Sequence, residues 1–114
     1  MTVEFRPIGD GDVDAVVALW QRCGLTVPWN DPHRDIATAQ SVDSADVLVG
    51  DDGGTIVASV MVGYDGHRGW LYYVAADPDR QGQGLGRATM AAAEAWFATR
   101  GVPKAELMVP RTTD

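Results

Sequence analysis

The chain has 114 residues, the size of one domain spanning 1–114, with no room for a second. Apolar residues make up 46% and charged residues 22%, which is typical of a soluble globular protein and excludes a disordered, collagen-like or disulfide-rich chain. Sixteen acidic against nine basic side chains give a net charge of −7, so we expect neither nucleic acid nor a membrane as a partner.

The beginning of the chain predicts a strand and then a helix. Residues 3–6 alternate in polarity and stop at Pro7, which predicts a short strand. Asp10 and Asp12 are candidate capping carboxylates for the helix. Apolar residues then recur at the spacing of one helical face that runs toward Gly24, namely Val13, Val16, Val17 and Trp20.

The middle of the chain predicts a weaker helix and three strands. The helix follows a turn and covers 33–42. The strands are expected at 46–50, 55–64 and 70–74, and the turns between them contain aspartate and glycine, which tolerate positive φ. Because short turns join antiparallel neighbours, this part predicts an antiparallel meander.

The last part of the chain predicts a strand–helix–strand unit. A glycine-rich loop follows 77–80, a helix is expected over 85–100, and a fifth strand over 105–109. A right-handed crossover would make this fifth strand parallel to strand 70–74. The fold class is therefore mixed α/β (α+β), a mainly antiparallel sheet flanked by helices, with a β-α-β crossover that carries the loop.

The loop from Gln81 to Arg87 is the strongest functional signal. Its three glycines leave a ligand free to approach the backbone. The N–H groups and the dipole of the following helix favour an anion, so phosphate or pyrophosphate is the natural ligand. Arg80 and Arg87 flank the loop and can add charge-assisted hydrogen bonds. The alternative is a connection whose glycines only let helix and strand pack closely.

Two other nucleotide motifs do not fit this loop. The Walker pattern requires Gly-Lys-Ser/Thr, and no lysine lies near the loop. The Rossmann pattern requires a third glycine at the position of Arg87, and the loop follows an antiparallel meander rather than the first strand of a parallel sheet.

The residues Gln81, Gly84 and Gly86 resemble the acetyl-coenzyme A loop of the GNAT N-acetyltransferases, in which arginine or glutamine is followed at fixed spacing by glycine and then by glycine or alanine. The order of elements from Val3 to Val109 is similar to that family. The turns at 29–32 and 63–69 resemble its small bacterial YpeA-type branch.

The resemblance implies an acetyl-CoA-dependent N-acetyltransferase. A neutral primary amine, from a small molecule or from a protein N-terminus or lysine, would attack the thioester directly in a ternary complex. This needs orientation, a base for the ammonium proton and an acid for the thiolate. The cofactor-binding residues that the resemblance implies are Val74, Ala75, Ala76, Arg80, Gln81, Gly82, Gln83, Gly84, Leu85, Gly86 and Arg87.

The chain is C-terminally short against the family pattern. Family members normally continue past the fifth strand with a helix, which carries the tyrosine that usually acts as general acid, and a final pair of strands. We expect an exposed strand edge, for which a homodimer is a candidate cover. Two alternatives to the enzyme therefore stay open, a non-catalytic acyl-CoA-binding module and an incomplete domain that requires a partner chain.

The candidate catalytic residues are Glu106, His67 and Asp65. Glu106 lies on the fifth strand, where a carboxylate relays a proton through water in some relatives, and His67 titrates near neutral pH. The alternatives are that Glu106 only faces solvent and that Asp65 caps the backbone of its own turn.

The candidate substrate-binding residues are Trp29, Asn30, Tyr64 and Tyr72. Alternation along a strand predicts that Tyr72 and Tyr73 point to opposite faces of the sheet. Trp29 is alternatively a buried lid over the core. Trp20 and Trp96 lie on apolar helical faces and are expected in the core.

Few residues of the sequence bear on the cellular compartment or on metal binding. Cys23 is the only cysteine, which fits a reducing cytoplasm, and no nucleophilic role is expected for it. No apolar run approaches the ~20 residues of a membrane span, and the N-terminus lacks a signal-peptide pattern. His33 has no second ligand at metal spacing, so we expect no metal site.

Overall fold

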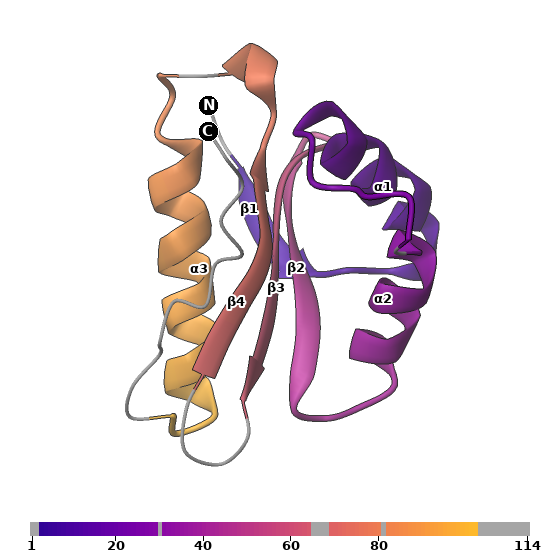
Figure 1. The fold of residues 1–114 in the computed structure, drawn as a ribbon. Helices are drawn as coiled ribbons and strands as arrows, with labels where there is room; N and C mark the ends of the chain where they lie inside the picture. Colours follow the sequence, from indigo (N-terminus) through magenta and orange to yellow (C-terminus); the bar gives the residue numbers. More distant parts are fainter. Residues whose placement is uncertain (1–2, 30, 65–68, 81, 103–114) are drawn as a thin grey trace.

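A computed structural model describes residues 3–29, 31–64, 69–80 and 82–102. One antiparallel sheet has the strand order β1 (Glu4–Pro7), β2 (Ala45–Asp52), β3 (Thr55–Tyr64) and β4 (Gly69–Ala76). The helices α1 (Val13–Arg22) and α2 (Pro32–Gln40) cover one face of the sheet, and α3 (Leu85–Thr99) covers the other (Figure 1). The predicted fold class is confirmed. The expected strand 105–109 lies outside the described residues.

The element boundaries follow local chemistry. The turn between β2 and β3 consists of Gly53 and Gly54, both at positive φ, and the backbone N–H of Gly54 donates to Asp51 Oδ1 at 2.7 Å. Asp31 caps α2, because its side chain accepts from the backbone N–H groups of His33 and Arg34. The sequence predicts capping carboxylates at the first helix, but the N-cap residue of α1, Asp12, makes no side-chain capping bond to that helix.

One apolar layer lies on each side of the sheet. Alternation along β2 divides them, since Val47 and Val49 pack toward α1 and α2 whereas Leu48 packs toward α3. The indole of Trp20 is fully buried in the first layer, and Trp96 is buried in the second. Both were predicted as core residues, and both predictions are confirmed.

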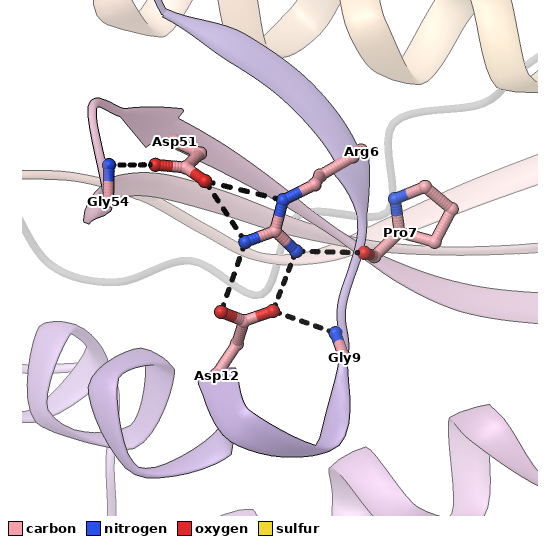
Figure 2. A network of polar contacts seen from close by, with 6 residues as sticks. All are labelled: Arg6, Pro7, Gly9, Asp12, Asp51 and Gly54. Carbon is pink, nitrogen blue, oxygen red and sulfur yellow. Dashed lines mark hydrogen bonds and ion pairs between the residues drawn. The ribbon is translucent and has the colours of Figure 1, made fainter.

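An arginine joins β1 to the two segments beside it (Figure 2). The Arg6 guanidinium donates to Asp12 through Nη1 at 2.6 Å and Nη2 at 3.1 Å, and to Asp51 through Nη2 at 3.1 Å. Asp12 lies in a short 3-10 helix, η1 (Asp10–Asp12), and also accepts from the backbone N–H of Gly9 at 2.8 Å. Asp12 is one of the two carboxylates that the sequence predicts as candidate caps of the first helix.

Among the described residues, none of the helices combines the length and apolar character that crossing a bilayer requires.

Candidate functional site

A bulge in β4 shapes the centre of the site. Met61 faces Tyr72 and Ser59 faces Ala75, so Tyr73 and Val74 together oppose the single residue Val60. Tyr73 has φ +52, the left-handed region that bulky side chains rarely adopt. The bulge shifts the alternation of side chains by one position from there on.

The prediction that Tyr72 and Tyr73 point to opposite faces is therefore wrong. Tyr73 packs into the layer under α1 and α2, and Tyr72 borders a pocket on the same side, next to residues of α2. Val74 packs instead toward α3. The physical reason is the extra residue of the bulge, which a period of two cannot anticipate.

Packing and hydrogen bonds hold Tyr73 in this conformation. Its ring stacks on Trp20 with centroids 4.0 Å apart and planes at 8°, and its hydroxyl donates to Asp35 Oδ2 at 2.6 Å. The Trp20 indole N–H in turn donates to the buried Ser59 hydroxyl at 2.7 Å. Burial, with the Asp35 carboxylate as the second cause, raises the pKa of Tyr73 to about 12. The phenol therefore stays protonated at neutral pH, and its hydrogen bond to Asp35 and its stack on Trp20 fix the position of this part of β4.

A first pocket, which we call the loop pocket, lies where β4 ends and α3 begins. It has a volume of about 360 Å³ and is lined by Ala76, Asp77, Arg80, Leu85 and the three loop glycines. Gly82 and Gly84 have φ of +83 and +78, which explains glycine at these two positions. A Cβ built on Gly82, Gly84 or Gly86 would meet no atom within 4 Å, so the space above all three is open to a ligand.

The N-terminus of α3 supplies the polar groups of the loop pocket. Gly84 is its N-cap and provides no side-chain cap, and the first turn contains no acidic residue. The helix's own bonds begin with Ala88 N–H donating to Gly84 O at 3.0 Å, so the N–H groups before it are the unpaired donors of a helix start. Open glycines beneath a helix N-terminus fit a phosphate or pyrophosphate, as the sequence pattern predicts.

The end of β4 is fixed to the rest of the molecule next to this pocket. The backbone N–H of Asp77 donates to Val57 O at 2.8 Å, and its carboxylate pairs with Arg22 at 3.2 Å. The Cys23 thiol donates to Ala76 O at 3.3 Å, and burial raises its pKa, which disfavours the thiolate. Arg80 pairs with Asp52, so a phosphate would have to share this guanidinium with a carboxylate.

A second pocket, which we call the aromatic pocket, lies between α2 and the strands β3 and β4. It has a volume of about 470 Å³. Its walls include Ala39, Met61, Trp70, Tyr72 and Tyr73, and Asp35 is the one acidic residue among the described residues that line it. The described part of this pocket therefore combines apolar and aromatic surface with a single carboxylate.

The structure separates the predicted substrate-binding residues. Tyr72 lines the aromatic pocket, but Tyr64 lies toward α3, edge-on to Trp96 with ring centroids 5.8 Å apart. The Trp29 side chain is 81% exposed, so the alternative of a buried lid is wrong. The predicted site residues that lie outside the described residues are Asn30, Asp65, His67, Gln81 and Glu106.

The remaining cofactor-binding candidates lie around the loop pocket as follows. Ala75 is buried toward α1, while Gln83 and Arg87 are exposed at the loop. The residue of the aromatic pocket that sequence reasoning missed is Asp35. The carboxylate in the first turn of the weak helix gave no signal of its own, because its partner is 38 residues away in the chain. Within the described ranges, no three His, Cys, Asp or Glu side chains gather in a way that could hold a metal ion.

Comparisons with known proteins agree with this geometry. The model of the acetyltransferase (GNAT) family matches residues 13–113. An acetyltransferase of Pectobacterium atrosepticum is 44% identical over 112 residues, which cover 98% of this chain and 79% of that protein.

Solved structures show the same fold at lower identity. A ribosomal-protein-alanine N-acetyltransferase from Brucella melitensis has a TM-score of 0.78 at 17% identity, with 99% of this chain and 84% of that one covered. A predicted acetyltransferase with acetyl-CoA from Clostridium acetobutylicum has a TM-score of 0.77 at 14% identity, with 94% and 80% covered. The family model, the relative and the fold lead to one conclusion: this chain is an acetyltransferase that belongs to the GNAT family.

Proposed function

We propose that the protein transfers the acetyl group of acetyl-CoA to a primary amine within a ternary complex. The observation that carries this proposal is the loop pocket, with its open glycines beneath the N-terminus of α3. The pyrophosphate of the cofactor would accept hydrogen bonds from the first-turn N–H groups of α3. Bound there, acetyl-CoA supplies an activated thioester.

The residues of this chain would bind and orient the two substrates. In the transfer, a bond forms between the amine nitrogen and the acetyl carbonyl carbon while the bond from that carbon to sulfur breaks. The ammonium must first lose a proton, and the departing thiolate gains one. We propose Glu106, with His67 and Asp65, for the first proton, and Tyr73 only as a residue that holds β4 in place.

The partners that we propose are an amine acceptor and, at the sheet edge, a second copy of this chain. A small-molecule amine and a protein N-terminus or lysine share the chemistry that the proposal requires. The net charge of −7 favours the approach of a cationic acceptor over that of an anionic one.

A thermal melt with and without acetyl-CoA tests cofactor binding, with NADH as the control ligand. At a hundred times its Kd, acetyl-CoA adds about 2.7 kcal/mol to the free energy of unfolding, a rise in Tm of roughly ten degrees. No rise with acetyl-CoA, or an equal rise with NADH, would contradict the proposal.

A pair of glycine variants assigns the binding to the loop pocket. Gly86→Leu places a side chain in open space at the loop without requiring positive φ, and should abolish the shift in Tm. Gly11→Leu introduces the same side chain into equally open space in η1, and should leave the shift unchanged.

A second pair of variants tests the chemistry. Glu106→Gln and His67→Ala should slow acetylation of an amine, followed by the mass of the product, while the Tm shift with acetyl-CoA stays. If neither variant changes the rate, the assignment of the base is wrong although cofactor binding stands.

A further inference from the structure

The aromatic pocket contains the chemistry of a cation site. Trp70 and Tyr72 occupy alternate positions of β4 on one face, and both side chains line the pocket. Asp35 extends from the first turn of α2 and is half-buried. The Tyr73 hydroxyl donates to Asp35 Oδ2 at 2.6 Å, which fixes the direction of the carboxylate.

The second oxygen of this carboxylate is available to a ligand. Among the described residues, only the Tyr73 hydroxyl donates to the Asp35 side chain, and it bonds Oδ2, so Oδ1 has no donor there. None of the described residues that line the pocket is a lysine, arginine or histidine. A carboxylate on an anionic ligand would therefore find no cationic partner in this wall, whereas an ammonium would find Asp35.

We propose that the aromatic pocket binds the acceptor as an amphipathic cation, an ammonium group carried on an apolar or aromatic body. The ammonium pairs with Asp35, and the body lies against Met61, Trp70 and Tyr72. Aromatic faces near the ammonium add cation–π attraction. This inference rests on the proposed function, because it names the class of amine that the enzyme acetylates.

The position of the pocket along β4 supports this assignment. Tyr73 belongs to the aromatic pocket and Ala76 to the loop pocket, and the two residues are three positions apart on one strand. A strand rises about 3.3 Å per residue, so roughly 10 Å of β4 separates the two pockets. A cofactor bound at the loop and extended along β4 would bring its thioester toward the amine.

The same chemistry disfavours two other classes of acceptor. Free amino acids carry a carboxylate beside the amine, and amino sugar phosphates carry a phosphate. Both anions would face Asp35 with no cationic residue among the described residues of the pocket wall. The net charge of the chain, −7, also repels anionic acceptors of these two classes.

Binding of three small probes tests the inference without any need for turnover. 2-Phenylethylamine has the aromatic body and the cation, 2-phenylethanol lacks the cation, and phenylalanine adds a carboxylate to the same skeleton. Titration of the full chain, followed by NMR, should give a Kd for 2-phenylethylamine at least fivefold lower than for either other probe. Equal affinities for 2-phenylethylamine and 2-phenylethanol would overturn the inference.

Variants assign the binding to named residues. Asp35→Asn keeps an acceptor for the Tyr73 hydroxyl but removes the charge, and should raise the Kd of 2-phenylethylamine about tenfold while leaving that of 2-phenylethanol unchanged. Asp14→Asn is the matched control, because it removes one charge from a side chain of α1 that is 97% exposed. Equal losses in both variants would overturn the role of Asp35.

Tyr72→Leu tests the wall independently of the carboxylate. It should raise the Kd values of 2-phenylethylamine and 2-phenylethanol by similar factors, and unchanged affinities would overturn the assignment to this pocket. The shift in Tm with acetyl-CoA, measured on the same variants, separates the two proposals. A normal shift without selective binding of the amine would leave the proposed function standing and the inference rejected. Selective binding without any shift would keep the cation site but reject the proposed function, and with it the role of this pocket as the acceptor site.

Discussion

The Trp20 indole stacks almost parallel on the Tyr73 phenol, with ring centroids 4.0 Å apart and an angle of 8° between the planes. Trp20 belongs to α1 and Tyr73 to β4, so this contact joins a helix of one layer to the strand that borders both pockets. The indole is fully buried and bonded to Ser59, and is therefore a rigid surface for the phenol. The strained left-handed backbone conformation of Tyr73 persists because the contacts around this residue hold it in place.

Glycine should be better tolerated than alanine at position 73. Because Tyr73 has φ +52, Tyr73→Ala keeps the backbone strain while losing the stack, and Tyr73→Gly loses the stack but relieves the strain. We expect Tyr73→Gly to be more stable than Tyr73→Ala by about 1 kcal/mol, measured by urea unfolding. The control is Tyr72, which is not at positive φ. There, alanine should be the more stable of the two by about 0.5–1 kcal/mol, and the same order at both positions would contradict the explanation.

Trp20 and Ser59 should show strong coupling in a double-mutant cycle. Ser59→Ala leaves the buried indole N–H without its partner at 2.7 Å, which costs about 1–3 kcal/mol in the free energy of unfolding. Trp20→Phe removes that N–H as well as part of the packing. Adding Ser59→Ala to Trp20→Phe should therefore cost about 1 kcal/mol less than Ser59→Ala alone. Additive losses would show that the hydrogen bond contributes little.

The Arg6 network should make the fold sensitive to acid. The hydrogen bonds from Arg6 hold the pKa of Asp12 below its ordinary value. A lowered pKa in the folded state means that this contribution to stability is complete above about pH 4, the pKa range of an unfolded aspartate. The contribution is then lost as the pH falls through the folded value.

Replacing the arginine tests this pH dependence. Arg6→Met should lower Tm at pH 7 and flatten the decline of Tm from pH 5 to pH 2, measured by circular dichroism. Arg34→Met is the control, since the exposed Arg34 side chain forms no ion pair among the described residues. Parallel declines in the wild type and in Arg6→Met would rule out this origin of the acid sensitivity.

Gly69 should not accept even a methyl group. A Cβ at Gly69 would lie 2.7 Å from Cδ1 of Phe97, a residue of α3 whose ring is buried between this helix and the sheet. Gly69→Ala should therefore cost about 1–3 kcal/mol, since overpacking moves side chains from their preferred positions. Gly11→Ala, where nothing lies within 4 Å, should change stability little. Phe97→Leu in the Gly69→Ala background should recover part of the loss; no recovery would place the strain elsewhere.

Local chemistry was sufficient to predict much of the fold. Strand 55–64 has its predicted bounds, because valine-rich alternation is bounded by glycine turns. The helix after the glycine-rich loop is predicted over 85–100 from that loop and from Gly101. It begins at the predicted residue and ends one residue earlier, at Thr99. The loop pocket was predictable for the same reason, since its glycines and the start of α3 are neighbours in the sequence.

The aromatic pocket was not predictable because it depends on contacts between distant residues. The extra residue in β4 becomes visible only once its register against β3 is known, and that register places Tyr72 and Tyr73 on one face. The orientation of the Asp35 carboxylate depends on its hydrogen bond from Tyr73, which lies 38 residues further along the chain. Neither fact leaves a periodic signal in the sequence.

The outer strands of the described sheet differ in a way that decides how the sheet can grow. β1 has four residues, ends at a proline that has no N–H to donate, and carries the charge of Arg6. β4 has eight residues and borders both pockets. A strand added to this sheet would therefore pair more readily with β4 than with β1. Self-association and occupancy of the two pockets would then be thermodynamically linked, and the apparent affinity for small molecules would vary with protein concentration.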